Sequence, residues 1–251
     1  MNHITSLIFQ TWLQFLVRYR RTFIGPLWIV VGPSLFVLTL GLLFSQISGA
    51  KAEVFIPHLT IGLVVWTLVS GFVNGSTTVF QRSRAQILQG GMNLLDVVFV
   101  DVTTTVFHFV HQIIIIGVVF LIFHIPVTVY ALVSLIGLFL LFANGVWLAV
   151  LFGIIGARYR DLVEVTQAVM RIAFLVTPII WMVGEQGRGG ILGVFLVYYP
   201  FYHFLELIRA PLLNNPIQPL SWIVVLSITF SGVFLARYYF KRYSGQVALW
   251  I

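Results

Sequence analysis

Residues 127–156 read VTVYALVSLIGLFLLFANGVWLAVLFGIIG and contain no charged side chain. A helix of roughly 20 residues crosses the hydrocarbon core of a bilayer, so this stretch alone predicts a membrane span. Other parts of the chain have the same character. The predicted spans are Leu27–Ile47, Leu59–Phe80, Val102–Phe123, Val127–Gly156, Leu162–Gly184 and Leu220–Ala236. The sequence therefore predicts an all-α membrane protein with six transmembrane helices, built as a single domain over residues 1–251.

The composition and the placement of charge support this fold class. The chain of 251 residues is 60% hydrophobic and 8% charged and lacks cysteine, which excludes a soluble domain, disulfides and thiol chemistry. With the N-terminus in the cytoplasm, all of the 14 lysines and arginines except Lys51, Arg188 and Arg209 fall on the cytoplasmic side. This bias predicts that both termini are cytoplasmic. It also explains the net charge of +7 and favours anionic lipid headgroups, not nucleic acid, as partners.

The N-terminal segment differs from the spans because its apolar and polar residues alternate at helical spacing. Residues 3–22 predict an amphipathic helix that lies in the membrane interface, with Trp12 among its apolar residues. Its basic and aromatic end comprises Arg18, Tyr19, Arg20 and Arg21. The alternative is an unstructured basic leader. Gly25-Pro26 should break the helix before the first span.

Small residues predict where helices approach closely. Gly71 and Gly75 form a GxxxG pair in the second span. The fourth span repeats a small residue at every fourth position, namely Gly145, Ala149, Gly153 and Ala157. We therefore expect both spans to pack tightly against neighbouring helices.

The fifth span and the segment after it are irregular. Arg171 precedes the charge-free part of the span and should snorkel to the inner headgroups, whereas Pro178 should kink the helix. Ile191–Tyr199 and Phe201–Leu213 are apolar but too short to span, and Pro200 separates them. Such a pair predicts a re-entrant hairpin on the outer side.

Both cytoplasmic loops hold candidate contact residues. The first loop carries Arg82, Arg84 and Gln86. It is polar and compatible with a short helix, so a soluble partner could bind it, although a solvated loop would have the same composition. Arg160 and Asp161 precede the fifth span, and Asp161 should cap that helix in a capping box with Glu164.

The outer segment carries a dense aromatic cluster. Its members are Tyr198, Tyr199, Phe201, Tyr202 and Phe204. Two interpretations stay open: an interfacial aromatic belt, or a stacking surface for sugar rings. Glu206 and Arg209 lie three residues apart on a predicted helix and should pair.

Several chemistries are absent from the sequence. Neither lysine follows a phosphate-binding GxxxxGK[ST] loop, and no acidic residue lies at the centre of a span. The first absence argues against an ATPase, the second against an ion-coupled carrier. His108 and His111 could share a helix face with Asp101, but polar contacts between helices are favoured over a metal site there.

Taken together, these features resemble the membrane subunit of the ABC polysaccharide exporters, the permeases for O-antigen, capsule and teichoic acid. The resemblance covers nearly the whole chain. It rests on Arg18-Tyr19-Arg20-Arg21 before Ile24-Gly25-Pro26-Leu27-Trp28 and Pro33, on Arg158-Tyr159-Arg160-Asp161-Leu162 with Thr177-Pro178-Ile179, and on Tyr199-Pro200-Phe201-Tyr202-His203 with Glu206 and Arg209-Ala210-Pro211. The chain departs from the family at Tyr199, where asparagine is usual, and at Met92–Val100, where a lysine and Phe-Pro are often found.

The resemblance implies a type-2 permease of the bacterial inner membrane, in which two copies form the channel. Two separate ABC ATPase subunits would bind ATP and Mg²⁺, so this chain would hold no cofactor and would not be an enzyme. The cargo would be a lipid-linked glycan. The resemblance assigns ATPase coupling to Arg82, Arg84, Gln86, Arg160 and Asp161, and the outer gate to Tyr198, Tyr199, Phe201, Tyr202, Phe204, Glu206 and Arg209.

Two alternatives remain open at this point. One is a type-2 ABC permease for drugs or another lipid. The other is an intramembrane polyprenyl-phosphate transferase, which would need acidic metal ligands at a membrane face, and Asp96 and Asp101 would be the candidates for them.

Overall fold

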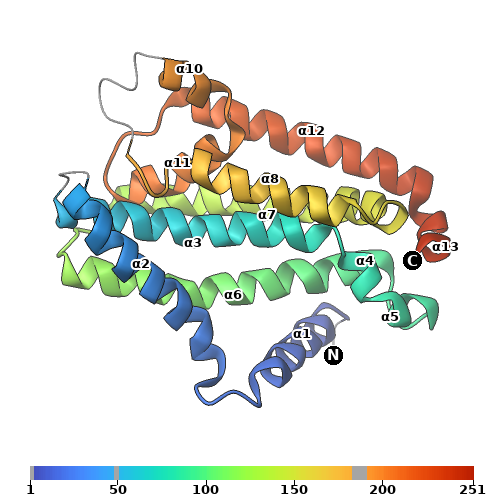
Figure 1. Cartoon of the computed structure of the whole chain (residues 1–251). Coiled ribbons are helices and arrows are strands. Elements are labelled where there is room, and N and C mark those ends of the chain that lie inside the picture. Colours follow the sequence, from blue (N-terminus) through green and yellow to red (C-terminus); the bar gives the residue numbers. More distant parts are fainter. Residues whose placement is uncertain (1–2, 48–50, 183–190) are drawn as a thin grey trace.

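The structure, a computed structural model, describes residues 3–47, 51–182 and 191–251, and these residues form helices joined by short connections (Figure 1). The longer helices are α1 (His3–Tyr19), α2 (Trp28–Ile47), α3 (Ala52–Ser76), α6 (Leu94–Ile122), α7 (Val133–Arg158), α8 (Leu162–Val176), α11 (Pro200–Leu212) and α12 (Pro219–Tyr243). The shorter ones are α4 (Val79–Arg82), α5 (Arg84–Leu88), α10 (Ile191–Tyr198) and α13 (Val247–Trp250). Three 3₁₀ turns also occur among the described residues: η1 (Gly25–Leu27), η2 (Val129–Leu132) and η3 (Ser244–Gln246).

Five of these helical segments, among the residues described, are long and apolar enough to cross a membrane. They are Gly25–Phe44, Ala52–Ser76, Leu94–Ile122, Val129–Arg158 and Pro219–Trp250. The multi-pass character predicted from the sequence is therefore confirmed. The sixth predicted span, Leu162–Gly184, is not among them, so the sixth crossing stays a prediction.

The helix α8 ends earlier than predicted. It has 15 residues, which corresponds to about 22 Å of helix. Thr177 is extended, with φ −71° and ψ 135°, because a residue before proline avoids the α region. Pro178 therefore terminates α8, and the predicted kink within a continuous fifth span is wrong. The rest of that predicted span, 183–184, lies outside the described residues.

The predicted outer hairpin corresponds to two short helices. α10 and α11 meet at Tyr199, which has an extended conformation before Pro200. α11 packs against α3, α7 and α12, and most of its residues are buried. The break at Pro200 is thus confirmed, whereas re-entry into the membrane stays a prediction.

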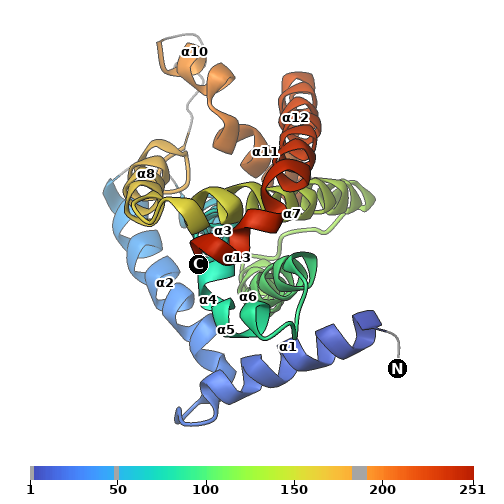
Figure 2. The ribbon, with the colours of Figure 1, turned by 90° about the vertical axis from the view of Figure 1, so that its right-hand side faces the viewer.

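The N-terminal helix lies across the bundle. Figure 2, which views the bundle nearly end-on, shows α1 along its length beneath α6. Leu7, Thr11 and Phe15 are buried at spacings of four residues and form the side of α1 that faces the protein. The chain turns after α1, and Gly25 adopts φ +60°, a left-handed conformation that glycine accommodates without strain. The predicted helix and its break are both confirmed.

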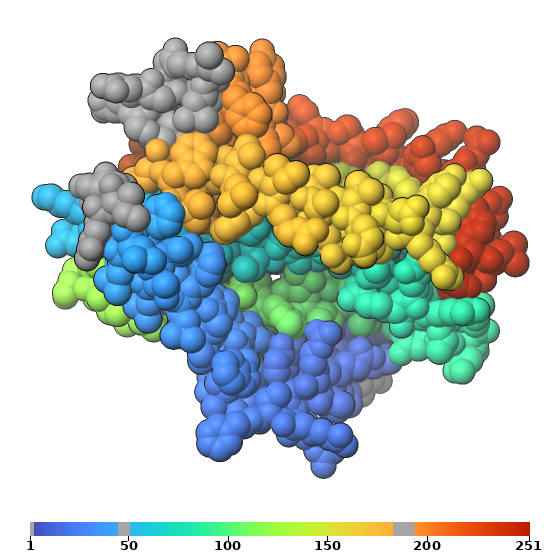
Figure 3. All heavy atoms as spheres, in the orientation of Figure 1, coloured from blue at the N-terminus to red at the C-terminus, as the bar shows by residue number. Residues whose placement is uncertain are grey.

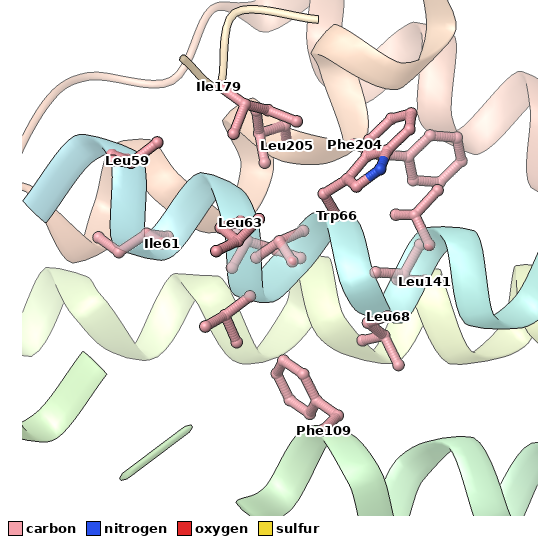
Figure 4. Close-up of a cluster of buried hydrophobic side chains, with 14 of the residues drawn as sticks. Leu59, Ile61, Leu63, Trp66, Leu68, Phe109, Leu141, Ile179, Phe204 and Leu205 are labelled. Carbon is pink, nitrogen blue, oxygen red and sulfur yellow. The ribbon is translucent and has the colours of Figure 1, made fainter. Parts of the chain in front are cut away.

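The helix α3 is at the centre of the molecule and carries much of the hydrophobic core. Leu59 and Leu68 on α3 are almost fully buried. Figure 4 shows Ile179 and Leu205 together on the side of α3 that faces α11. α3 contacts α2, α6, α7, α8 and α11, so the other helices are arranged around it.

Small residues allow the close contacts that the sequence predicts. A Cβ atom on Gly71 would lie 2.9 Å from Thr105 Cγ2 of α6. A Cβ atom on Gly145 would lie 2.7 Å from the Phe72 ring of α3. Real Cβ atoms do not approach that closely without displacing a neighbour. Both predicted small-residue faces are therefore helix contacts, as in other membrane bundles.

The predicted capping of α8 is wrong, and a capping box occurs elsewhere. Asp161 occupies the N-cap of α8 in the α region, with φ −64° and ψ −17°, and its side chain makes no capping hydrogen bond. An N-cap side chain reaches the helix from an extended backbone, which Asp161 lacks. Asn93 has that backbone, and Asn93 and Asp96 form a reciprocal capping box at the start of α6.

Candidate functional site

A polar groove lies between α3 and α8. Its volume is about 460 Å³. The lining residues are Trp66, Ser70 and Asn74 from α3 and Gln167, Met170, Arg171, Phe174 and Leu175 from α8. The carboxamide, hydroxyl and guanidinium groups in this groove contrast with the apolar faces of the bundle.

Arg171 is the charged residue of this groove. It is exposed and forms no ion pair with any described residue. Arg171 lies about 14 Å from the first residue of α8, at 1.5 Å per residue, and so lies well beyond the first turn of the helix. Across the groove, Asn74 Oδ1 is buried and has no hydrogen-bond partner among the described residues. The groove therefore presents a charge, and an unsatisfied acceptor is buried beside it.

A series of aromatic rings extends from this groove to α2 and to α11. The Phe174 ring lies 6.4 Å from Phe36 and 5.8 Å from Trp66. Trp66 lies 5.5 Å from Phe201, which lies 5.7 Å from Tyr199. The series joins α2, α8, α3 and α11. Sequence reasoning found Tyr199 and Phe201 but missed the other three, because no local pattern connects positions so far apart in the chain.

The predicted aromatic cluster does not form one exposed surface. Tyr198 is 81% exposed, whereas Tyr202 and Phe204 are 7% and 8% exposed. The Tyr199 hydroxyl donates a hydrogen bond of 3.0 Å to the carbonyl oxygen of Ala173. The cluster is thus divided between exposed, half-buried and buried positions.

A buried polar cluster joins α11 to α3 and to the end of α8. The Glu206–Arg209 pair predicted from the sequence is confirmed, with 3.3 Å between Oε2 and Nη2. Arg209 is 5% exposed and its Nη1 lies 3.1 Å from His58 Nε2. His58 Nε2 also lies 3.2 Å from the Pro178 carbonyl oxygen and 3.3 Å from that of Trp181. Carbonyl oxygens only accept and guanidinium groups only donate, so the tautomer of His58 decides which of these contacts is a hydrogen bond. Sequence reasoning missed His58, whose sole signal was a polar residue beside Pro57 at the start of an apolar helix.

This cluster borders a cavity of about 320 Å³. Its lining includes His58, Tyr202, Glu206, Arg209, Asn215 and Gln218. The Arg209 guanidinium also donates to the carbonyl oxygen of Pro178 over 2.6 Å. The N-terminal part of α3, the C-terminal end of α8 and α11 therefore meet at one polar centre.

The residues that the resemblance assigns to ATPase contact fall into two groups. Arg84 and Arg160 line one surface pocket of about 270 Å³ together with Gln81 and Trp250. Gln81 Nε2 donates a hydrogen bond of 2.8 Å to the carbonyl oxygen of Gly156, which ties α4 to α7. The predicted short helix in this loop is confirmed as α4 and α5.

Arg82 and Gln86 belong to the second group, on the α1 side of the loop. Arg82 Nη2 lies 2.6 Å from Asp101 Oδ1, and both residues line a cavity with Gln86 and Arg18 of α1. Asp161 lines neither of these two pockets. The structure therefore brings Arg84 and Arg160 together and separates them from Arg82.

The histidines of α6 lie at its contact with α1. The His108 ring lies 5.5 Å from the Phe15 ring, and His111 Nδ1 lies 2.7 Å from the carbonyl oxygen of Phe107. Within the described ranges, no group of three or more His, Asp or Glu side chains could hold a metal ion. These contacts fit the role in helix packing that the sequence favours.

A second large cavity is apolar. Its volume is about 550 Å³, and it lies between α3, α7, α8, α11 and α12. Phe72, Leu148, Phe152, Met170 and Phe204 are among its lining residues. The neighbouring polar group of Asn144 is satisfied, because its Nδ2 donates to Thr229 Oγ1 over 2.7 Å. This cavity suits an apolar chain and not a sugar.

Comparisons with known proteins identify the family to which this chain belongs. No curated protein matches this sequence. The ABC-2 type transporter family matches residues 5–213, which covers α1 through α11 of the structure. The chain therefore belongs to the ABC-2 type transporter family, as a multi-pass transmembrane subunit of a type-2 ABC exporter that associates with an ABC ATPase.

Proposed function

We propose that the chain forms, with a second copy of itself, the channel of an exporter of lipid-linked polysaccharide in the bacterial inner membrane. The observation that carries this proposal is the polar groove around Arg171. An arginine on the lipid-facing surface of a bundle is unfavourable, and intramembrane charges face a protein interior or a water-filled cavity. A second copy covering the groove would provide that cavity.

The chemistry of the groove supports a glycan as cargo. Sugars present hydroxyl groups at their edges and C–H groups on their faces. Gln167, Asn74 and Arg171 supply hydrogen-bonding groups, and Trp66 and Phe174 supply aromatic rings beside them. Membership in a family of transport subunits gives the transferase alternative no support, and we do not retain it.

The apolar cavity could also hold the competing cargo, a drug or a simple lipid. A drug or a simple lipid would use the 550 Å³ cavity without the polar groove. A lipid-linked glycan would use both, with its lipid chain in the apolar cavity. Variants of the two sites therefore distinguish the cargoes: groove variants impair glycan export only, whereas cavity variants impair both.

Cysteine labelling tests the channel. Because the chain has no native cysteine, Ser70→Cys and Gln167→Cys each introduce a single thiol in the groove. A charged, water-soluble methanethiosulfonate should label both in intact membranes. Phe230→Cys on α12 is the control: Phe230 is 72% exposed but lies away from the groove, where we expect lipid. Equal labelling of all three, or labelling of the control alone, contradicts a channel at this groove.

Deletion of the gene tests the cargo. Surface polysaccharide should be lost, and lipid-linked glycan should accumulate on the cytoplasmic side. The purified chain should hydrolyse no ATP without its ATPase partner. Normal surface glycan with loss of drug resistance would identify the competing cargo instead, and ATP hydrolysis by the chain alone would exclude both exporter assignments.

A further inference from the structure

A cavity between α1, α4, α5 and α6 is separate from the proposed channel. Its volume is about 290 Å³. Figure 3 shows atoms of α1 and of the α4–α5 segment meeting at this end of the molecule. The polar lining comprises Gln14, Arg18, Arg82, Ser83, Gln86, Asp101 and Thr104. We propose that this cavity binds the phosphate of an anionic membrane phospholipid, and that the bound lipid links the interfacial helix to the cytoplasmic loop.

Two arginines reach the cavity from different helices. Arg18 on the last turn of α1 is exposed and forms no ion pair among the described residues. Arg82 uses its Nη2 atom for both of its described hydrogen bonds, 2.6 Å to Asp101 Oδ1 and 2.8 Å to the carbonyl oxygen of Gly75. Its Nη1 and Nε atoms have no acceptor within the described part of the chain. A guanidinium fork presented in this way suits two oxygens of a phosphate.

The charge of the cavity matches a phosphodiester. Arg18 and Arg82 oppose the single carboxylate of Asp101, which leaves one net positive charge. A phospholipid phosphodiester carries one negative charge. Gln14, Ser83 and Gln86 add neutral donors, and no hydrogen bond of their side chains to another described residue competes with a ligand. The net positive charge of the cavity therefore balances the negative charge of one phosphodiester, and no further cation is needed.

The position of the cavity favours a lipid over a soluble anion. Ile8 and Phe9 on α1 are 42% and 54% exposed. A helix with such a face lies in the membrane interface, with its apolar side chains at the level of the upper acyl chains. Arg18 on the same helix is then level with the headgroups. This proposal is independent of which cargo the exporter moves.

Lipid binding by the purified full-length chain tests the proposal. Phosphatidylglycerol and phosphatidylcholine are titrated separately into the detergent-solubilised chain, and the bound lipids are counted by native mass spectrometry. We expect at least one retained phosphatidylglycerol and weaker retention of phosphatidylcholine. Arg18→Gln should weaken phosphatidylglycerol binding about fivefold, the contribution of one arginine near an anionic surface. Arg21→Gln should not, because Arg21 lies outside the cavity.

A variant with the opposite expected sign separates binding from folding. Asp101→Asn removes the opposing carboxylate and should tighten phosphatidylglycerol binding about fivefold. A merely structural Arg82–Asp101 pair predicts lower stability and no gain in lipid affinity. Equal loss in Arg18→Gln and Arg21→Gln, or unchanged affinity in Asp101→Asn, overturns the proposal. Displacement of the lipid by equimolar inorganic phosphate would identify a soluble-anion site instead and also overturn it.

Discussion

Arg209 Nη1 donates a hydrogen bond of 2.6 Å to the carbonyl oxygen of Pro178, the residue that follows the end of α8 by two positions. The same side chain pairs with Glu206. One buried guanidinium thus binds its own helix and the neighbouring one. This connection ties the end of α8 to α11 through one buried side chain.

Replacing Arg209 should therefore destabilise the protein and loosen its outer end. Arg209→Ala leaves Glu206 without its partner, and the loss of one partner of a buried pair costs about 3 kcal/mol of unfolding free energy. Chemical denaturation in detergent measures this loss. In vesicles that also contain the ATPase, the variant should raise basal ATP turnover or ion leak. The double variant Glu206→Ala/Arg209→Ala should recover part of the stability, and a double variant less stable than Arg209→Ala would contradict the pairing.

Two acidic residues at helix starts should behave differently. Asp96→Ala removes a capping box and should lower the unfolding free energy by about 1 kcal/mol. Asp161→Ala should leave stability unchanged, because the Asp161 side chain makes no capping bond. Thermal denaturation of both variants checks this difference. If Asp161→Ala impairs export at normal stability, Asp161 acts through the ATPase contact.

Substitutions of Arg82 and Arg84 should also have different effects. Arg84 lies in the pocket shared with Arg160, where we expect an acidic surface of the ATPase to bind. Arg84→Glu places like charges at that interface and should reduce ATP-driven export at least about tenfold. Arg82→Glu faces Asp101 instead and should lower stability by at least about 1 kcal/mol, because it replaces an ion pair with two like charges and the Asp101 side chain is only 13% exposed. Export assays normalised to inserted protein, with a topology reporter, measure both. Equal uncoupling by the two variants would mean that the loop acts as one surface.

Glycine positions provide a matched pair of packing variants. In Gly156→Ala the new Cβ would lie 2.0 Å from the carbonyl oxygen of Thr77, so helix separation should cost about 2 kcal/mol. In Gly117→Ala the new Cβ meets nothing within 4 Å, and the better helix former should leave stability equal or higher. Expression level and thermal denaturation report both. A neutral Gly156→Ala variant would show that α7 can move away from α3 without penalty.

The aromatic series supplies the last prediction. Phe174→Ala should slow glycan export about fivefold, as expected for loss of one aromatic contact, whereas the exposed Tyr198→Ala should export normally. Export is again normalised to membrane-embedded protein. A flat normalised rate in both variants would leave the aromatic residues a role in the interfacial belt alone.

Local sequence patterns predict much of this fold but not its polar connections. Apolar length identifies the five helical segments that are long enough to span a membrane, and Gly71 and Gly145 mark true helix contacts because helical spacing is a local property. The same reasoning failed at Pro178 and Asp161. At both positions the local structure depends on the backbone conformation that the residue adopts. Proline can kink a helix or end it, and aspartate caps a helix only from an extended conformation.

The candidate sites were only partly predictable for a related reason. Glu206 and Arg209 lie one turn apart, so their pairing follows from helix geometry. His58 and Arg209, or Trp66 and Phe201, come from distant parts of the chain. Their meeting depends on how whole helices pack, and a single sequence carries no periodic signal for such contacts.

The early end of α8 has a mechanical consequence. Its C-terminal end is held by the Tyr199 hydroxyl at Ala173 and by Arg209 at Pro178, whereas no side chain caps its N-terminal end at Asp161. A force applied near Arg160 would then turn α8 about a fixed C-terminal hinge instead of translating it. The displacement would be greatest at the N-terminal end, so the groove beside Arg171 would open as a wedge from that end.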